Sequence, residues 1–352
     1  MNILLTHCWQ TGNTGDVAIW KSMIDHLKEA FPVSITICSQ KTEAWDVEQL
    51  GKVKVAPLLS SKALEEADVV ISQGGGYMNG DDMINHFTYF RVAQRLGKPT
   101  FFASQTFIGN LSKETRELGK TVLNNANLVV AREEESFKLI QHLGVNGYHL
   151  KLLPDGVFTV KAKKYPKLLP PEAVKIGIRG YLAAPGLLKE IAKFADMAVE
   201  TLGPVVFIPI GHGSRDDRVQ ANEIAGMMDH KSLVINDRPD AGQLIDILKD
   251  GILISNRYHG IVYAASACTP FVPMTPDIDF KMPGLLKMID YPFNNVLLTE
   301  TVKAEDIFEY AVSVWKLKEQ IRAGLEKTIP GVKRKAESVY QLIIKGIKDG
   351  IT

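Results

Sequence analysis

Short apolar runs alternate with longer amphipathic segments along most of the chain. In the first half the runs have the length of strands, and the segments between them repeat apolar residues at helical spacing. The predicted strands are 3–6, 33–38, 68–72, 100–103, 128–131 and 148–153, and the predicted helices are 16–31, 82–96, 113–126 and 133–143. This alternation is typical of a mostly parallel sheet covered by helices.

The alternation is interrupted by a basic segment with three prolines, from Lys161 to Pro171, which we interpret as an interdomain linker. From 302 onward the chain is helical by composition, with an interruption expected near Pro330-Gly331. Between these segments the predicted strands are 174–179, 205–209, 233–235, 251–255 and 271–273, and the predicted helices are 186–202, 216–228, 241–249, 260–267 and 280–289.

We therefore predict an α/β protein with two Rossmann-like parallel-sheet domains facing a cleft. The predicted parts are an N-terminal domain (1–160), the linker (161–173), a C-terminal domain (174–330) and a helix (331–352) that could pack back on the N-terminal domain. Two similar halves joined by a hinge indicate a site in the cleft between them.

Composition and charge limit which classes of partner and which compartment we expect. The 352 residues include 41 Lys and Arg against 40 Asp and Glu, a net charge of +1 that argues against a nucleic-acid partner. The three cysteines are far apart, which suits a reducing compartment, and no signal peptide or membrane-spanning run is recognisable. We expect a cytoplasmic protein. The basic tail could contact the inner face of a membrane, although a solvated helix face explains the same pattern.

Two glycine-containing segments follow predicted strands. Gly12, Asn13, Gly15 and Asp16 lie between the first strand and the first helix, where backbone N–H groups can meet a ligand. An ordinary strand-to-helix turn explains them equally well, and their spacing does not match a dinucleotide loop.

The second segment, Gly74, Gly75 and Gly76, is predicted to be a ligand-facing loop, because three consecutive glycines are hard to explain by packing alone. Asp81 and its polar neighbours could then meet the hydroxyls of a sugar-like group.

The strongest site signal is Arg257 and His259, which follow an apolar strand and precede a helix of small residues. If the chain is still extended there, the two side chains point to the same side. Arginine matches a carboxylate or phosphate, and histidine can move a proton near neutral pH. A structural Arg–Tyr–His cluster is the alternative.

Three more cations leave predicted strands in the same way: Arg132, Arg179 and Lys281. Each alone is more often a surface charge, but together with Arg257 they indicate an anion site. The histidines show no shared metal-ligand spacing, with His212 a weaker candidate for the cleft. We therefore expect neither a metal site nor a cofactor.

Taken in order, these motifs resemble the polysaccharide pyruvyl transferases, over about residues 2 to 290. Two departures are Glu133, where the family commonly has Asp, and Trp9-Gln10-Thr11, where small residues are more usual. The matching pieces are Gly12-Asn13-Thr14-Gly15-Asp16, Gln73-Gly74-Gly75-Gly76, Val130-Ala131-Arg132 with Ser136, Leu153-Pro154-Asp155, and Arg257-Tyr258-His259-Gly260 followed by Asp279-Phe280-Lys281.

The resemblance implies a fold like that of the GT-B glycosyltransferases and a transferase that moves a pyruvyl group from phosphoenolpyruvate to a cell-surface or exopolysaccharide sugar, free or lipid-linked. It implies that Arg132, Arg257, His259 and Lys281 hold phosphoenolpyruvate in the second domain and cleft, and we add Arg179 to this donor set. We expect His259 to be the general acid and Lys281 to stabilise the departing phosphate.

The acceptor is expected over the Gly74–Gly76 loop of the first domain, with Asp16, Asp81 or Asp155 as the base. Two alternatives stay open: a nucleotide-sugar glycosyltransferase of the same architecture, and a non-catalytic anion- or sugar-binding protein.

Overall fold

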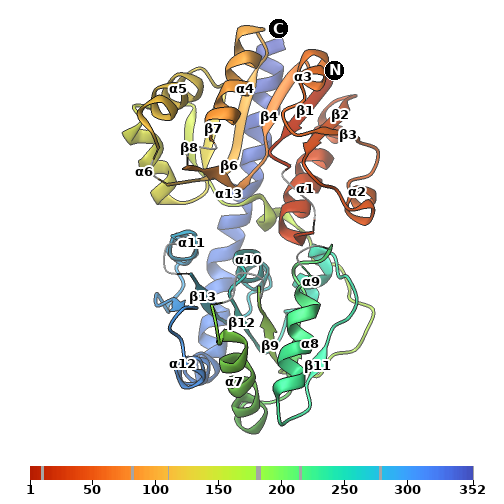
Figure 1. The fold of residues 1–352 in the computed structure, drawn as a ribbon, viewed down its shortest axis with the longest axis vertical. Helices are drawn as coiled ribbons and strands as arrows, with labels where there is room; N and C mark the ends of the chain where they lie inside the picture. The colour runs from red at the N-terminus through yellow and green to blue at the C-terminus, as the bar shows by residue number, and fades with distance from the viewer. Residues whose placement is uncertain are drawn as a thin grey trace. The chain divides into compact units, whose positions relative to one another are not determined.

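The computed structural model describes residues 1–8, 12–80, 83–109, 111–179, 184–213, 216–276 and 280–351. They fold into two compact units (Figure 1). Unit 2 contains Gly12–Gly15 and Val160–Val332, and unit 1 contains the remaining described residues, including the chain from Lys333 onward.

Unit 1 is built on a parallel sheet of eight strands in the order β3-β2-β1-β4-β6-β7-β8, with β5 paired to β6 beyond the end of β4. The strands are β1 (Asn2–Thr6), β2 (Ser34–Ser39), β3 (Lys54–Pro57), β4 (Val69–Ser72), β5 (Gly75–Asn79), β6 (Thr100–Ile108), β7 (Leu128–Ala131) and β8 (Leu150–Leu152). The helices are α1 (Thr14–Ala30), α2 (Ala44–Leu50), α3 (Ser61–Glu66), α4 (Met83–Arg95), α5 (Lys113–Asn124) and α6 (Glu134–His142), followed by a 3-10 turn at Gly156–Thr159.

Helices cover both faces of this sheet because alternate strand residues point to opposite sides. On one face Leu4, Val70, Phe102 and Val129 share a buried core with residues of α3, α4, α5 and α6. On the other face Phe101 packs against α13 (Lys318–Ile351), so tightly that a Cβ on Gly346 would lie 2.6 Å from its ring.

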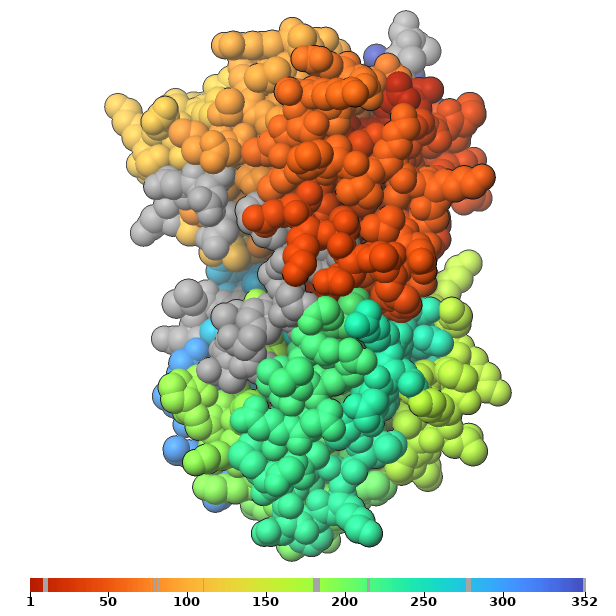
Figure 2. Space-filling view, turned by 45° about the vertical axis from the view of Figure 1, so that its right-hand side comes forward, coloured from red at the N-terminus to blue at the C-terminus, as the bar shows by residue number. Residues whose placement is uncertain are grey.

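Unit 2 has a six-stranded parallel sheet in the order β11-β10-β9-β12-β13-β14. Helix α7 contacts both α8 and α12, and α9 contacts α10. The green segment that contains α8 forms much of the face of unit 2 visible in Figure 2. The strands are β9 (Val174–Gly177), β10 (Val205–Phe207), β11 (Leu233–Val234), β12 (Ile252–Ser255), β13 (Phe271–Thr275) and β14 (Leu297–Leu298). The helices are α7 (Leu187–Thr201), α8 (Asp217–Met227), α9 (Ala241–Ile247), α10 (Tyr258–Ser266), α11 (Lys281–Met288) and α12 (Ala304–Lys316).

Both sheets share one topological feature that positions ligands. In unit 1 the first strand (β1) lies beside the fourth (β4), and in unit 2 β9 lies beside β12. The chain leaves the two neighbouring strands in opposite directions, which opens a crevice at their carboxyl ends. This is the switch point where ligands of doubly wound sheets bind.

Two details differ from the sequence predictions. The Gly74–Gly76 segment is not a loop: Gly75 begins β5, which pairs with β6, and the side chain of Met78 is fully buried. Gly74 is packed closely, because a Cβ there would lie 3.3 Å from the Ser104 carbonyl oxygen and from Ile19. Of the three glycines, only Gly76 is exposed.

The second difference is in the tail, where α13 continues through Pro330 without the expected interruption (Figure 1). Ile329 and Val332 beside it are buried, and this packing outweighs the helix-breaking preference of proline. Segment 161–173, which we interpret as the linker, makes hydrogen bonds within unit 2: the amide of Lys163 donates to the Gly242 carbonyl, and the Tyr165 hydroxyl donates to Asp237.

Candidate functional site

The carboxyl ends of β9 and β12 in unit 2 are tied together by side chains. Ser255 Oγ donates to the Gly177 carbonyl oxygen at 2.6 Å and accepts from the amide of Arg257 at 3.0 Å. One residue further, Asn256 Oδ1 accepts from the amide of Arg179 at 2.7 Å. The switch point of unit 2 is therefore a rigid frame, and Arg257 and His259 come directly after it.

Arg257 is the N-cap residue of α10, and its guanidinium is buried and paired. Its Nε donates to Oδ2 of Asp217 at 3.0 Å, and its Nη2 donates to Oδ1 of the same carboxylate. Asp217 also accepts from the backbone amides of Ile210 (3.0 Å) and Gly211 (2.7 Å). Burial raises the pKa of Asp217, and the guanidinium beside it opposes that rise. Asp217 therefore orients Arg257 and also holds the backbone at Ile210 and Gly211, just beyond β10.

His259 lies in the first turn of α10 and is 7% exposed. The sequence predicts that the two side chains point to the same side if the chain is extended there, but the chain is helical from Tyr258 onward, where α10 begins. The two side chains are instead brought to one place by the start of this helix. The free backbone N–H groups of its first turn favour negative charge there.

Gly12–Gly15 form part of the same site in unit 2. Asn13 makes an antiparallel bridge with Gly211, and the amide of His212 donates to the Gly12 carbonyl at 2.8 Å. Thr14 Oγ1 donates to the carbonyl oxygen of Ile210 at 2.9 Å. This segment brings Gly15 against the ring of His259. Gly12 therefore packs against the backbone of His212, and Gly15 packs against the imidazole of His259.

The remaining predicted cations of unit 2 also lie beyond strand ends. Arg179 follows β9, Lys281 is the first residue of α11, and both are half-buried. Asp16 is buried in the first turn of α1. Asp81, which was predicted to lie near the acceptor, is outside the described residues.

In unit 1, Arg132 and Asp155 are brought together. Arg132 is 2% exposed, and it donates from Nη1 to Asp155 Oδ2 at 2.6 Å and from Nε to Thr106 Oγ1 at 2.6 Å. A second carboxylate, Glu133, lies 3.3 Å from Arg132 Nε. Two buried carboxylates thus surround one guanidinium. The donor set predicted from sequence is divided, with Arg132 in unit 1 and the other four residues in unit 2.

Two features were not predicted from the sequence: Asp217, which holds Arg257, and the polar residues at the switch point of unit 1. The signal for Asp217 was weak: one of two adjacent acids at the start of a helix that follows a strand. Nothing local marks it as the partner of an arginine 40 residues away.

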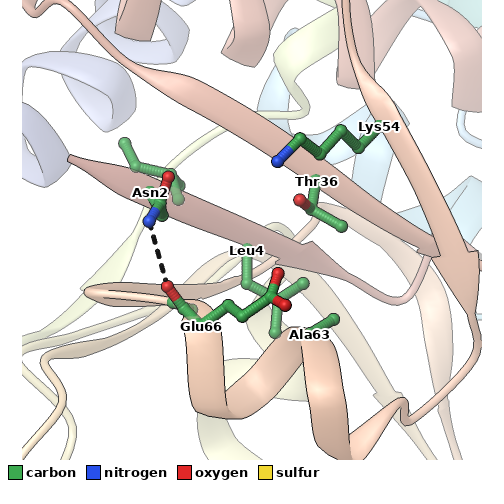
Figure 3. A pocket seen from close by; sticks show the side chains of 8 residues that line it. Asn2, Leu4, Thr36, Lys54, Ala63 and Glu66 are labelled. Atoms are coloured by element: carbon green, nitrogen blue, oxygen red, sulfur yellow. Dashed lines mark hydrogen bonds between the residues drawn. The ribbon is translucent and has the colours of Figure 1, made fainter.

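A cavity of about 230 Å³ in unit 1 lies at the opposite edge of the sheet, beside the amino-terminal halves of β1 and β2 and the start of β3 (Figure 3). Asn2, Lys54 and Glu66 line it, and Asn2 Nδ2 donates to the Glu66 carbonyl at 3.1 Å. Because ligands of such sheets bind at the carboxyl edge, we do not place the site here.

Within the described part of the chain, no cluster of three or more His, Cys, Asp and Glu side chains is arranged to hold a metal ion. Among the helices that the structure describes, none has the length and hydropathy needed to cross a bilayer.

The comparisons with known proteins agree with this architecture. The family model for polysaccharide pyruvyl transferase matches residues 13–278, more than half of the chain. A search of curated proteins finds no match.

Several solved structures are similar over nearly their whole length. The S. aureus MnaA–UDP complex has a TM-score of 0.66 at 13% identity, covering 99% of this chain and 97% of that one. The Neisseria meningitidis UDP-GlcNAc 2-epimerase bound to UDP-GlcNAc has a TM-score of 0.67 at 12% identity, covering 98% and 100%. The Anabaena HepE–UDP complex has a TM-score of 0.61 at 12% identity, covering 99% and 100%. At these identities the likeness shows the fold alone, and it confirms the predicted GT-B-like class of two parallel-sheet α/β domains.

Proposed function

Because the chain belongs to the polysaccharide pyruvyl transferase family, a family of transferases, we propose that it moves a pyruvyl group from phosphoenolpyruvate to a sugar of a cell-surface or exopolysaccharide, or of its lipid-linked precursor. The products are a pyruvate ketal and phosphate. The observation that carries this proposal is the buried pair of Arg257 and His259 at the start of α10, at the switch point of unit 2.

The donor has two anionic groups, a carboxylate and a phosphate, on one carbon. A guanidinium fork and the N-terminus of a helix suit such a ligand. Asp217 occupies Nε and one Nη of Arg257 and fixes the plane of the fork. In the proposal Arg257 and the first turn of α10 hold the donor, and Lys281 and Arg179 add positive charge at neighbouring strand ends.

The reaction needs a proton on the methylene carbon of phosphoenolpyruvate. In the proposal His259 gives that proton, which leaves a cationic centre on the adjacent carbon. A sugar hydroxyl attacks this centre and loses its proton, and the C–O bond to phosphate breaks. A second hydroxyl of the sugar then attacks the same carbon, loses its proton and closes the ketal ring. Of the two protons that the hydroxyls lose, one restores the proton that His259 gave and the other leaves with the phosphate, so atoms and charge balance without a redox partner.

The structure changes the role that we propose for two residues of unit 1. Asp155 is ion-paired with Arg132, so it is a poor general base, and Arg132 already faces two carboxylates. We propose that Arg132 acts by fixing Thr106 of β6 and the carboxylates of Glu133 and Asp155, which follow β7 and β8. Arg257, His259 and Lys281 are then the principal donor residues.

The test is phosphate release from phosphoenolpyruvate by the purified protein with a panel of saccharide acceptors. We expect release that depends on acceptor, with His259→Gln lowering turnover about 100-fold or more, because general acids contribute about that much. His230→Gln is the matched control, since His230 is a partly exposed surface histidine of the same unit. Full turnover in His259→Gln would refute the role of the imidazole.

The second candidate is a nucleotide-sugar enzyme, favoured by solved structures of the same fold that hold UDP or UDP-GlcNAc. Thermal shift separates the two candidates. We expect phosphoenolpyruvate to raise the unfolding midpoint and UDP-GlcNAc to leave it unchanged. The opposite pattern would favour the second candidate.

A further inference from the structure

The switch point of unit 1 is built from polar groups that the donor chemistry does not use. Thr6, the last residue of β1, is in register with Ser72, the last residue of β4. His7 follows directly, and its Nδ1 lies 2.6 Å from Ser72 Oγ. The carboxyl ends of these two central strands are therefore joined by an imidazole–hydroxyl hydrogen bond.

Two neighbouring elements complete this polar cluster, which consists of His7, Ser72, Gln73, His86 and Gln105. From β6, Gln105 Nε2 donates to Ser72 Oγ at 2.7 Å and to the carbonyl oxygen of Gln73. From α4, the ring of His86 lies with its centroid 4.1 Å from that of His7. Burial, with His86 beside it, holds the pKa of His7 well below its usual range. None of these five described side chains is a carboxylate or a permanent cation.

Several atoms of the polar cluster have hydrogen-bonding capacity to spare. Among the described residues, His7 Nε2, Gln105 Oε1 and both side-chain polar atoms of Gln73 have no hydrogen-bond partner. All three side chains are 0% exposed. Buried polar groups are almost always satisfied, because an unsatisfied one costs its full desolvation penalty. Such atoms at a switch point indicate a bound partner that is itself polar.

The backbone conformation at His7 also supports a ligand site at this switch point. Its φ is +59°, in the left-handed region that non-glycine residues rarely adopt. A conformation of this kind persists where the surroundings enforce it, and it is common at ligand sites. Here it turns the chain out of β1 with the imidazole directed to Ser72.

The switch points of the two units differ in charge. The switch point of unit 2 has the Arg257–Asp217 pair at the start of α10 and suits an anion, whereas the five described side chains of the polar cluster in unit 1 are amides, a hydroxyl and imidazoles. We propose that the switch point of unit 1 binds an uncharged, hydroxyl-bearing ligand, with Ser72, His7 and Gln105 as its hydrogen-bonding floor. The identity of that ligand as the saccharide acceptor rests on the proposed function.

Ligand-observed NMR of the full chain without donor tests this directly. The probes are methyl β-D-galactoside and methyl β-D-glucoside, with methyl β-D-glucuronide as the charged counterpart. We expect saturation transfer to the neutral glycosides, and at least fivefold less to the glucuronide. Ser72→Ala and His7→Asn should each reduce transfer to the neutral glycosides at least fivefold. Asparagine is chosen at residue 7 because it tolerates a positive φ.

Ser39→Ala is the matched control, because Ser39 is a buried serine at the carboxyl end of β2, outside the polar cluster. It should bind the glycosides like the wild type. Phosphoenolpyruvate affinity should stay within twofold in all three variants, since Arg257 and His259 belong to unit 2. If the wild type bound the neutral glycosides but not phosphoenolpyruvate, the proposed function would be refuted and this inference would stand.

Three outcomes would overturn the inference. The first is no saturation transfer to either neutral glycoside. The second is transfer to the glucuronide equal to that of the neutral probes. The third is full glycoside binding in both Ser72→Ala and His7→Asn, whatever their stability, which would mean that the buried atoms hold ordered water only.

Discussion

The imidazole of His259 lies directly against Gly15. A Cβ atom on residue 15 would fall 2.0 Å from Cγ and 2.1 Å from Nδ1 of the ring, where real Cβ atoms essentially never come within 3.0 Å. Glycine at this position is thus required by the imidazole. The contact explains why a glycine stands at the start of α1, where alanine would otherwise be the better helix former.

We expect Gly15→Ala to lower turnover at least tenfold and to lower the urea unfolding midpoint. The added methyl group must displace the His259 ring, and overpacking of this kind costs about 1–3 kcal/mol. Gly324→Ala is the control, because a Cβ there meets nothing within 4 Å. It should raise the midpoint, since alanine in a helix is favoured over glycine by about 0.5–1 kcal/mol. Wild-type turnover in Gly15→Ala would mean that the position of the ring is unimportant.

The pair of Asp217 and Arg257 gives a second prediction. We expect Asp217→Asn to destabilise the protein by about 3 kcal/mol, because it removes the negative charge of the buried carboxylate that holds the Arg257 guanidinium through two hydrogen bonds. Phosphoenolpyruvate should also bind more weakly, since the fork loses its fixed plane. Isothermal titration and urea unfolding measure the two effects.

The neighbouring acid provides the control for that variant. Asp216 pairs with Arg218 in a partly exposed setting, and an asparagine there can still cap α8. Asp216→Asn should therefore cost less than about 1 kcal/mol. If both variants behaved alike, burial of the Arg257 pair would have no energetic consequence.

The fold was predictable from sequence where strands are buried on both faces. Leu128–Ala131 is a strand with the predicted bounds, because a central parallel strand is a continuous apolar run. The edge strand β3 was missed because its residues are mostly exposed and it ends in proline. The glycine strand β5 was read as a loop because its own residues favour one, and only its pairing with β6 makes it a strand.

The site was predictable only in its local parts. Arg257 and His259 are two residues apart, so one helix start brings them together. Their partner Asp217 is 40 residues from Arg257, and Ser72 is 65 residues from His7. Such contacts depend on which strands are neighbours in the sheet, and residue types alone do not determine that order.

A substitution at Arg132 distinguishes a positioning role of this residue from direct binding of the donor. We expect Arg132→Lys to destabilise the protein by about 3 kcal/mol, because an ammonium cannot reach both Thr106 and Asp155 as the guanidinium does. Phosphoenolpyruvate affinity should change less than threefold. Lys138→Ala, which removes an exposed ion pair on α6, should leave both quantities unchanged. A large loss of donor affinity without loss of stability would restore Arg132 to the donor set.

The buried imidazole of His7 predicts how stability depends on pH. Its pKa in the folded protein is well below the ordinary 6.5, first because of burial and then because of His86. Below about pH 6.5 the unfolded chain therefore binds a proton at His7 that the folded chain does not bind. The free energy of unfolding accordingly decreases as the pH falls below that value. The slope from this residue can approach about 1.4 kcal/mol per pH unit.

Urea unfolding between pH 8 and pH 5 should show a flatter dependence of the free energy of unfolding on pH for His7→Asn than for the wild type. His142→Gln, which replaces an exposed histidine of α6, should keep the wild-type slope. Equal slopes in His7→Asn and the wild type would show that the imidazole becomes protonated in the folded state at no cost.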